Sequence, residues 1–285
     1  MKLPFNIDLT DKVVVITGGA GVIGGYWVDA LAECGAKVAI LDLKLENAEK
    51  KADAVVANGK IALGVEANVL NKESLKKAHE IVLEKFGPCD ILINGAGGNN
   101  PKGTTTKEYL FPEDLAEDNK DLITFFDLDE QGVRFVFDLN FLGTLLPSQE
   151  FARDMIGREG CSIINVSSMN AFTPLTKIPA YSGAKAAISN FTQWLAVHFA
   201  KVGIRVNAIA PGFLVTAQNA ALLKNPDGSL TERSHKILNS TPMGRFGEPE
   251  ELIGALLFLV NESASSFING VVLPIDGGFS AYSGV

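Results

Sequence analysis

Tyr181 and Lys185 are the two residues whose types and spacing point most directly to chemistry. They lie four positions apart in the segment YSGAKAAISNF, and on a helix such a pair shares one face about one turn apart. An ordinary tyrosine, with a pKa near ~10, is a poor base at neutral pH, and a nearby ammonium stabilises the phenolate and lowers that pKa. The pair is therefore predicted to act as a general acid and base, although the same spacing occurs in many helices without function.

Ser168 is a second candidate, thirteen residues before Tyr181. It ends the strand-like run IINVSS, in which strand alternation turns Ser167 to the opposite side. A hydroxyl at the carboxyl end of a strand can donate a hydrogen bond to a substrate oxygen, and a cap or turn role would also suit a serine there. The spacing to Tyr181 favours the catalytic interpretation.

Alternating strand and helix signals predict the scaffold that positions these residues. Seven short β-branched runs are typical of buried strands: KVVVITGG, AKVAILDL, KIALGVEA, CDILINGAG, CSIINVSS, IRVNAIAPG and GVVLPIDGG. Segments with apolar residues at helical spacing cover residues 22–34, 45–58, 72–86, 131–156, 180–202 and 250–260. This alternation predicts a Rossmann-type α/β fold, a doubly wound parallel seven-stranded sheet in a three-layer α/β/α arrangement, as one catalytic domain over residues 1–285.

Composition limits the class of partner. With 285 residues, 47% apolar content and a formal net charge of −8, the chain can form one core and offers no basic face for nucleic acid or membrane. No long apolar run is present, and the odd number of cysteines predicts a cytoplasmic protein in which Cys34, Cys89 and Cys161 are buried and unpaired. The histidines lack metal-ligand spacing, so we expect no metal. Small molecules remain as the expected ligands.

A glycine-rich turn, TGGAGVIGG at residues 17–25, follows the first predicted strand and opens the first predicted helix. Gly19, Gly21 and Gly24 satisfy the GxGxxG spacing, in which glycines let the backbone approach a pyrophosphate at the helix N-terminus. Asp42 ends the second strand, where a carboxylate can accept both ribose hydroxyls of an adenosine and repel a 2′-phosphate. The pattern predicts NAD, with NADP less favoured, over the alternative of a structural turn beside a surface aspartate.

Ordered motifs give the chain a resemblance to the short-chain dehydrogenase/reductase family over nearly its whole length. Besides the glycine turn, the acidic strand end and Ser168, the matching motifs are NGAG at 94–97, NFLG at 140–143, YSGAK at 181–185, NAIAPG at 207–212 and PIDGG at 274–278. The glycine spacing departs from the family's common TGxxxGxG, because position 22 is Val. The third strand ends at Asn68, where the family usually has Asp for the adenine amino group, and an amide oxygen could serve in its place.

The resemblance implies a catalytic set of Asn140, Ser168, Tyr181 and Lys185. Tyr181 would exchange the hydroxyl proton with the substrate, Ser168 would polarise the carbonyl, and Lys185 would lower the tyrosine pKa and bind the nicotinamide ribose. Asn140 would hold a water that continues the proton relay, since an asparagine interrupting a long helix can create a water site. The implied cofactor contacts are Gly18, Gly19, Gly21, Val22, Ile23, Gly24, Asp42, Leu43, Asn68, Val69, Asn94, Gly95, Ala96, Gly97, Tyr181, Lys185, Pro211, Gly212, Phe213 and Thr216.

The connection between NGAG and NFLG is longer than is usual in the family, so residues from about 98 to 130 are interpreted as an insertion. Such connections are usually functional or disordered, and this one leaves the sheet beside the expected nicotinamide pocket. A segment at about 213–245 is predicted to cover the substrate. The candidate substrate contacts, against the alternative of a solvated turn with a stray cation, are Asn99, Asn100, Lys102, Asn170 and Gln218.

Amides and a lysine suit a substrate with hydroxyls and a carboxylate, which suggests a sugar acid. The NGAGGNNPK loop and its insertion resemble the D-mannonate oxidoreductase (fructuronate reductase) branch of the family, which implies NAD-dependent interconversion of D-fructuronate and D-mannonate. The family also implies a homotetramer formed through the long central helices. Two alternatives stay open: a related enzyme acting on another polyol, sugar or 3-oxoacyl substrate, and a non-catalytic NAD-sensing regulatory protein.

Overall fold

The computed structural model describes residues 7–116, 121–216, 223 and 225–284. Its centre is one parallel sheet in the order β3-β2-β1-β4-β5-β6-β7, which confirms the predicted Rossmann-type α/β fold and all seven strands. Their bounds are β1 (Val13–Thr17), β2 (Lys37–Asp42), β3 (Ile61–Glu66), β4 (Ile91–Asn94), β5 (Ser162–Val166), β6 (Arg205–Pro211) and β7 (Val272–Ile275). The order reverses direction between β1 and β4, and ligands bind at this point of doubly wound sheets.

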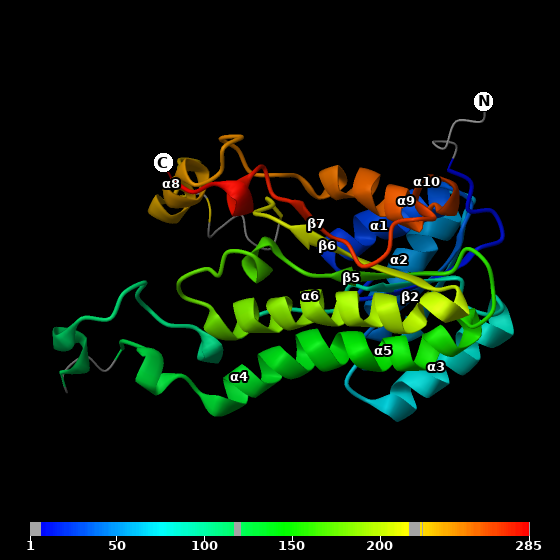
Figure 1. The fold of residues 1–285 in the computed structure, drawn as a ribbon, viewed down its shortest axis with the longest axis horizontal. Helices are drawn as coiled ribbons and strands as arrows, with labels where there is room; N and C mark the ends of the chain where they lie inside the picture. Colours follow the sequence, from blue (N-terminus) through cyan, green and yellow to red (C-terminus); the bar gives the residue numbers. More distant parts are fainter. Residues whose placement is uncertain (1–6, 117–120, 217–222, 224, 285) are drawn as a thin grey trace.

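Helices cover both faces of the sheet (Figure 1). One layer contains α1 (Val22–Glu33), α2 (Leu45–Ala57) and α9 (Ile253–Val260), and the other contains α3 (Lys72–Lys85), α4 (Glu130–Phe137), α5 (Gly143–Phe151) and α6 (Pro179–Phe199). Two apolar cores result, because successive side chains of a strand point to opposite faces. In β1, Val14 and Ile16 pack in the core with α1, whereas Val13 and Val15 pack in the core with α3.

The predicted helix at 131–156 is the segment in which the structure departs from the periodicity. Instead of one regular helix, the chain forms α4, a π-helical turn η4 (Asp138–Leu142), α5 and a 3-10 turn η5 (Ala152–Met155). Asn140 lies in the middle of the π turn, so the prediction that this asparagine interrupts the long helix is confirmed. The other predicted helices are present, with ends that differ by a few residues.

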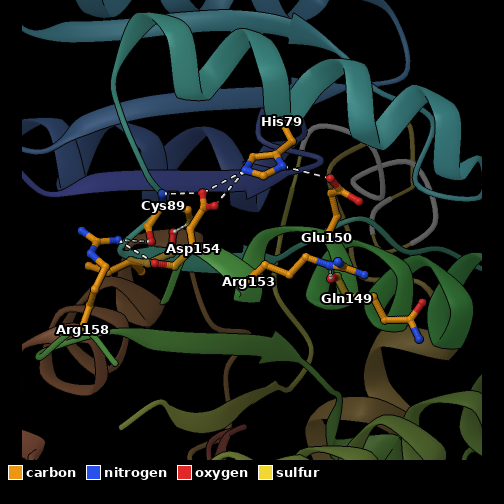
Figure 2. Close-up of polar contacts among 8 residues, drawn as sticks. His79, Cys89, Gln149, Glu150, Arg153, Asp154 and Arg158 are labelled. Carbon is orange, nitrogen blue, oxygen red and sulfur yellow. Dashed lines mark hydrogen bonds and ion pairs between the residues drawn. The ribbon is translucent and has the colours of Figure 1, made fainter. Parts of the chain in front are cut away.

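A histidine between two carboxylates fastens α3 to α5 and η5 (Figure 2). His79 Nδ1 lies 2.9 Å from Glu150 Oε1, and Nε2 lies 2.9 Å from Asp154 Oδ2. Asp154 also accepts a hydrogen bond from the backbone N–H of Cys89, just before β4. This polar network belongs to the scaffold, because Cys89 marks the amino-terminal edge of the sheet and the glycine turns lie at the opposite edge.

The three cysteines are free; Cys89 and Cys161 are buried as expected, whereas Cys34 is only half-buried. Within the described ranges, no group of three or more His, Cys, Asp or Glu side chains is arranged to hold a metal ion. The helices of the described residues also include none that is long and apolar enough to cross a membrane.

Candidate active site

The glycine turn between β1 and α1 has the shape that a dinucleotide phosphate needs. Gly18 has a φ of +66°, and a Cβ on Gly24 would lie 2.4 Å from the Gly18 carbonyl oxygen. Gly21 is the N-cap of α1, and no side chain caps this helix end. The shifted glycine spacing therefore still brings the turn against the start of α1, where the N–H groups of Val22, Ile23 and Gly24 suit a pyrophosphate.

Asp42 occupies the end of β2, beside this turn. Asp42 is half-buried, and its carboxylate accepts a hydrogen bond from the backbone N–H of Lys44, which is exposed. Asn68 follows β3 and uses its amide oxygen to accept the N–H of Leu70, while Val69 is buried. The position of Asp42 thus suits the predicted ribose contact. The amide oxygen of Asn68, predicted to contact the adenine, already accepts a hydrogen bond within its own turn.

The turn after β4 lies between the glycine turn and the catalytic candidates. The N–H groups of Gly95 and Ala96 both donate to Thr17 Oγ1, at 3.1 and 3.2 Å. A Cβ on Gly97 would lie 2.7 Å from Asn140 Oδ1 and 3.3 Å from Lys185 Nζ. Gly97 is therefore the point where the expected cofactor turn, the π turn and α6 meet.

Asn140 is completely buried, and its side chain binds protein backbone. Its Nδ2 donates to the carbonyls of Gly98 (2.7 Å) and Val136 (2.8 Å), and its Oδ1 accepts the Gly98 N–H (3.3 Å). The amide therefore clamps the first residue of the insertion. A water in the predicted proton relay would need a group of Asn140 other than this amide.

Ser168, Tyr181 and Lys185 come together at the carboxyl end of β5. Ser168 follows this strand and hydrogen-bonds to Tyr181, which lies in the first turn of α6. Lys185 Nζ donates to the Val166 carbonyl (2.8 Å) and lies 5.5 Å from the centre of the Tyr181 ring. Ser167 points to α6 and bonds to Ser189 Oγ at 2.7 Å, so the prediction that the two serines face different sides is confirmed.

Burial governs the acid–base properties of this pair. It raises the pKa of Tyr181 to about 12, against which the hydrogen bond from Ser168 acts in the lowering direction. It also lowers the pKa of Lys185 from 10.5 to about 7. Desolvation thus disfavours both charged forms, and it acts against the lowering of the Tyr181 pKa that the resemblance implies for Lys185.

The insertion begins beside the helical turn that carries Tyr181. Its first turn, η1 (Pro101–Gly103), contacts α6, since a Cβ on Gly103 would lie 3.5 Å from the Cβ of Ala180. Asn100 caps this turn by accepting the N–H of Lys102. The Lys102 side chain is exposed, and in the described part of the chain no carboxylate forms an ion pair with it.

The insertion continues through η2 (Pro112–Leu115) and η3 (Phe125–Asp127) and extends away from the helical layers (Figure 1). Its aromatic residues are largely exposed; Tyr109 and Phe126 each expose 69%. Lys107 pairs with buried Asp114 inside the insertion. These internal bonds order the loop and leave its apolar rings outward.

The predicted covering segment at 213–245 contacts the insertion. In α8 (Glu232–Asn239), Lys236 Nζ lies 3.1 Å from Glu108 Oε1 of the insertion, so the two segments are joined by an ion pair. His235, also in α8, is exposed. Gln218, a predicted substrate contact, lies outside the described residues.

The remaining predicted contacts lie near the ends of β5 and β6. Asn170 is buried two residues after Ser168, and its Oδ1 has no hydrogen-bond partner among the described residues. Pro211 ends β6, and Gly212 is so close to Asp276 that a Cβ would lie 2.5 Å from its Cα. Phe213 packs edge-on against Phe279 at 5.4 Å, and half-buried Thr216 is the last residue described before the gap.

Sequence reasoning missed three parts of this site. Motif matching could not reveal the clamp of Asn140 on Gly98, because the two residues are 42 positions apart. The Glu108–Lys236 ion pair joins residues 128 positions apart. The third part is buried Thr144, whose hydroxyl donates to the Asn140 carbonyl at 2.8 Å. Its i+4 spacing from Asn140 was the sequence signal that could have revealed this bond.

The parallel sheet, the glycine turn at the start of α1 and the cluster of Ser168, Tyr181 and Lys185 at the carboxyl end of β5 together point to the class of dinucleotide-dependent oxidoreductases. The chain belongs to the short-chain dehydrogenase family, since the model described as "short chain dehydrogenase" matches residues 12–227.

Relatives match the chain from end to end. A Haemophilus influenzae protein named "Uncharacterized oxidoreductase" is 59% identical, over 100% of this chain and 99% of its own length. "Uncharacterized oxidoreductase UxuB" of Bacillus subtilis is 50% identical, over 99% of this chain and 100% of its own. A crystal structure of a provisionally named D-mannonate oxidoreductase from Haemophilus influenza, with bound NAD, has a TM-score of 0.94 at 59% identity and full coverage of both chains.

Proposed function

We propose that this protein is an NAD-dependent oxidoreductase that interconverts D-fructuronate and D-mannonate. The single structural observation that carries the sugar-acid assignment is the Lys102 ammonium. It is exposed on η1, next to the first turn of α6, and has no carboxylate partner in the described ranges. By contrast, Arg245 is held by Glu251 and Lys236 by Glu108. The provisional name of the NAD-bound Haemophilus protein supports the same assignment.

NAD fits the residues at the carboxyl edge of the sheet. The tight approach of Gly24 to Gly18 and the uncapped start of α1 provide a phosphate cradle. Asp42 would accept the ribose hydroxyls and repel a 2′-phosphate, which favours NAD over NADP. When bound, NAD supplies the nicotinamide carbon that accepts or donates a hydride.

The chain's own groups handle the substrate oxygen. In the oxidation of D-mannonate, the Tyr181 phenolate accepts the proton of the reacting hydroxyl as the hydride leaves the same carbon, and in the reduction Tyr181 returns that proton. The Ser168 hydroxyl donates a hydrogen bond to the oxygen as it becomes a carbonyl. A charged Lys185 stabilises the phenolate, which offsets the effect of burial.

Substrate recognition is assigned to the start of the insertion. Lys102 would pair with the carboxylate of the sugar acid, and Asn99 would contact hydroxyl groups. The side-chain oxygen of Asn170, which has no partner among the described residues, would accept a hydrogen bond from a substrate hydroxyl near Ser168. Gln218 and the other residues of the segment at 213–245 would complete the cover.

A panel of hexuronates, ketoses, polyols and a 3-oxoacyl thioester, followed by NADH absorbance, tests the proposal. We expect D-mannonate and D-fructuronate to give the highest kcat/KM, with NAD(H) above NADP(H). Tyr181→Phe should lower kcat by about 10²–10⁴-fold. Faster turnover of a neutral polyol or of the thioester would contradict the sugar-acid assignment, and NAD binding without any turnover would indicate a sensing protein.

The same proposal includes a homotetramer. Two apolar side chains on α6 support an interface there, since Trp194 is 56% and Val197 is 78% exposed. Light scattering of the purified protein checks the mass, and a monomer would contradict the assembly.

A further inference from the structure

A closed set of hydrogen bonds joins both ends of the turn at residues 94–98 to the helix that carries Asn140. Asn94 Nδ2 donates to Ser148 Oγ (2.9 Å), and Ser148 Oγ donates to the Thr144 carbonyl (2.7 Å). Thr144 Oγ1 donates to the Asn140 carbonyl (2.8 Å). The Asn140 amide closes the ring on the N–H and carbonyl of Gly98. We name these five residues the brace.

The brace lies out of contact with solvent. Asn94, Asn140, Thr144 and Ser148 expose 1%, 0%, 1% and 2% of their surfaces. Water cannot readily replace a partner that is removed from such a place, so the loss of one hydroxyl removes a buried hydrogen bond that solvent does not restore. Each hydroxyl in the ring therefore restricts where its neighbours can lie.

The brace also explains how the π turn is held. A π turn displaces the regular i→i+4 backbone bonds of a helix. Here the Asn140 side chain donates to the Val136 carbonyl, and the Thr144 hydroxyl donates to the Asn140 carbonyl. Two side chains thus bond one carbonyl just before the π turn and one carbonyl within it.

The position of the π turn has a direct effect on the acid–base site. Asn140 Oδ1 and Lys185 Nζ both lie against Gly97, at 2.7 and 3.3 Å from the position of an added Cβ. If the π turn shifted, Asn140 would release Gly98, and the turn after β4 would move relative to the Lys185 ammonium.

We propose that Thr144 and Ser148 are positioning residues, whose hydroxyls hold the π turn so that Asn140 keeps the Gly97–Gly98 turn against Lys185. This inference deepens the proposed function and rests on its use of Lys185 and Tyr181. It does not depend on which sugar acid is the substrate.

Thr144→Val tests the inference, because it removes the hydroxyl and keeps the shape of the side chain. We expect kcat to fall about tenfold, the size of one lost buried hydrogen bond, with the KM for NAD and for the substrate changed less than about twofold. Hydrogen exchange at the Gly98 amide, followed by mass spectrometry, should accelerate. Thr144→Ser retains the hydroxyl and should restore both kcat and the protection of Gly98.

Ser265→Ala is the matched control. Its buried hydroxyl donates to the carbonyls of Leu259 and Asn261 at α10 (Glu262–Ser265), in the other helical layer. This variant should lose stability comparable to that of Thr144→Val without a change in kcat or in Gly98 exchange. If Thr144→Val does not fold, Ser148→Ala removes the next hydroxyl of the brace and is expected to give the same pattern.

Unchanged kcat and Gly98 exchange in both brace variants would overturn the inference. A fall in kcat that Thr144→Ser fails to restore, or a change confined to KM, would overturn it as well. The exchange measurement requires no substrate, so faster exchange of Gly98 in a protein that turns over no uronate would contradict the proposed function and leave the brace supported.

Discussion

Tyr181 and Lys185 lie one turn apart on α6, with the ammonium nitrogen 5.5 Å from the centre of the phenol ring. Burial disfavours the charge on each, raising the pKa of Tyr181 to about 12 and lowering that of Lys185 to about 7. A phenolate and an ammonium at this distance would stabilise each other. Burial acts against this charged form of the pair.

The lowered pKa of Lys185 predicts a pH dependence of folding stability. The native lysine loses its proton near pH 7, whereas the unfolded lysine keeps it until about 10.5. The unfolded state therefore binds more protons between these values, and stability rises with pH across this window. The Lys185→Met variant should lack this rise in stability with pH. The Tm of the variant minus the Tm of the wild type should therefore be highest near pH 6 and lowest near pH 10. A difference in Tm that is constant with pH would contradict the prediction.

Gly24→Ala should weaken NAD binding by about tenfold or more, because its Cβ would lie 2.4 Å from the Gly18 carbonyl and would displace the phosphate turn. The next residue supplies the control. A Cβ on Gly25 meets only the end of Lys51 at 3.8 Å, so Gly25→Ala should bind NAD normally and gain stability from better helix propensity. Isothermal calorimetry with NAD checks both variants, and equal Kd values would refute the role of Gly24.

Lys102→Met should raise the KM for a hexuronate about tenfold and change the KM for a neutral ketose less than twofold, since a charged hydrogen bond contributes roughly 1.5–3 kcal/mol. Steady-state kinetics with the two substrates provide the test. Lys107→Met is the control within the insertion: it breaks the pair with Asp114 and should affect both substrates alike. Equal effects of Lys102→Met on the two substrates would remove the carboxylate role.

The ion pair between Glu108 and Lys236 should couple the insertion to α8. We expect Glu108→Gln and Lys236→Met each to raise the substrate KM, with a coupling of about 0.2–1 kcal/mol in a double-mutant cycle that weakens with added salt. Glu232→Gln is the matched control, because Glu232 also pairs with Lys236, at 3.7 Å, from within α8. Additive effects of the two substitutions on KM would show that the insertion and α8 act independently.

The strands could be predicted well from the sequence because each is a β-branched apolar run that stops at a glycine or polar residue, and the five central ones are largely buried on both faces. The helical spacing of residues 131–156 did not show that the interruption at Asn140 is a π turn, because the side-chain bonds of Asn140 to Gly98 and Val136 leave no mark in that spacing. Spacing identified Tyr181, Ser168 and Lys185, but the pKa values of two of them are set by packing, which no motif records. The path of the insertion also depends on contacts with α6 and α8 that lie far away in the sequence.

The π turn changes the direction in which side chains point from α5 relative to α4. It holds one more residue than a regular turn, so the α5 half is rotated by about 100° from where α4 alone would place it. If the same residues formed a regular helix without the π turn, α5 would rotate relative to α4, and Asn140 would turn away from Gly98 or Ser148 away from Asn94. The chemistry of this site therefore depends on the backbone path at one point as well as on residue identity.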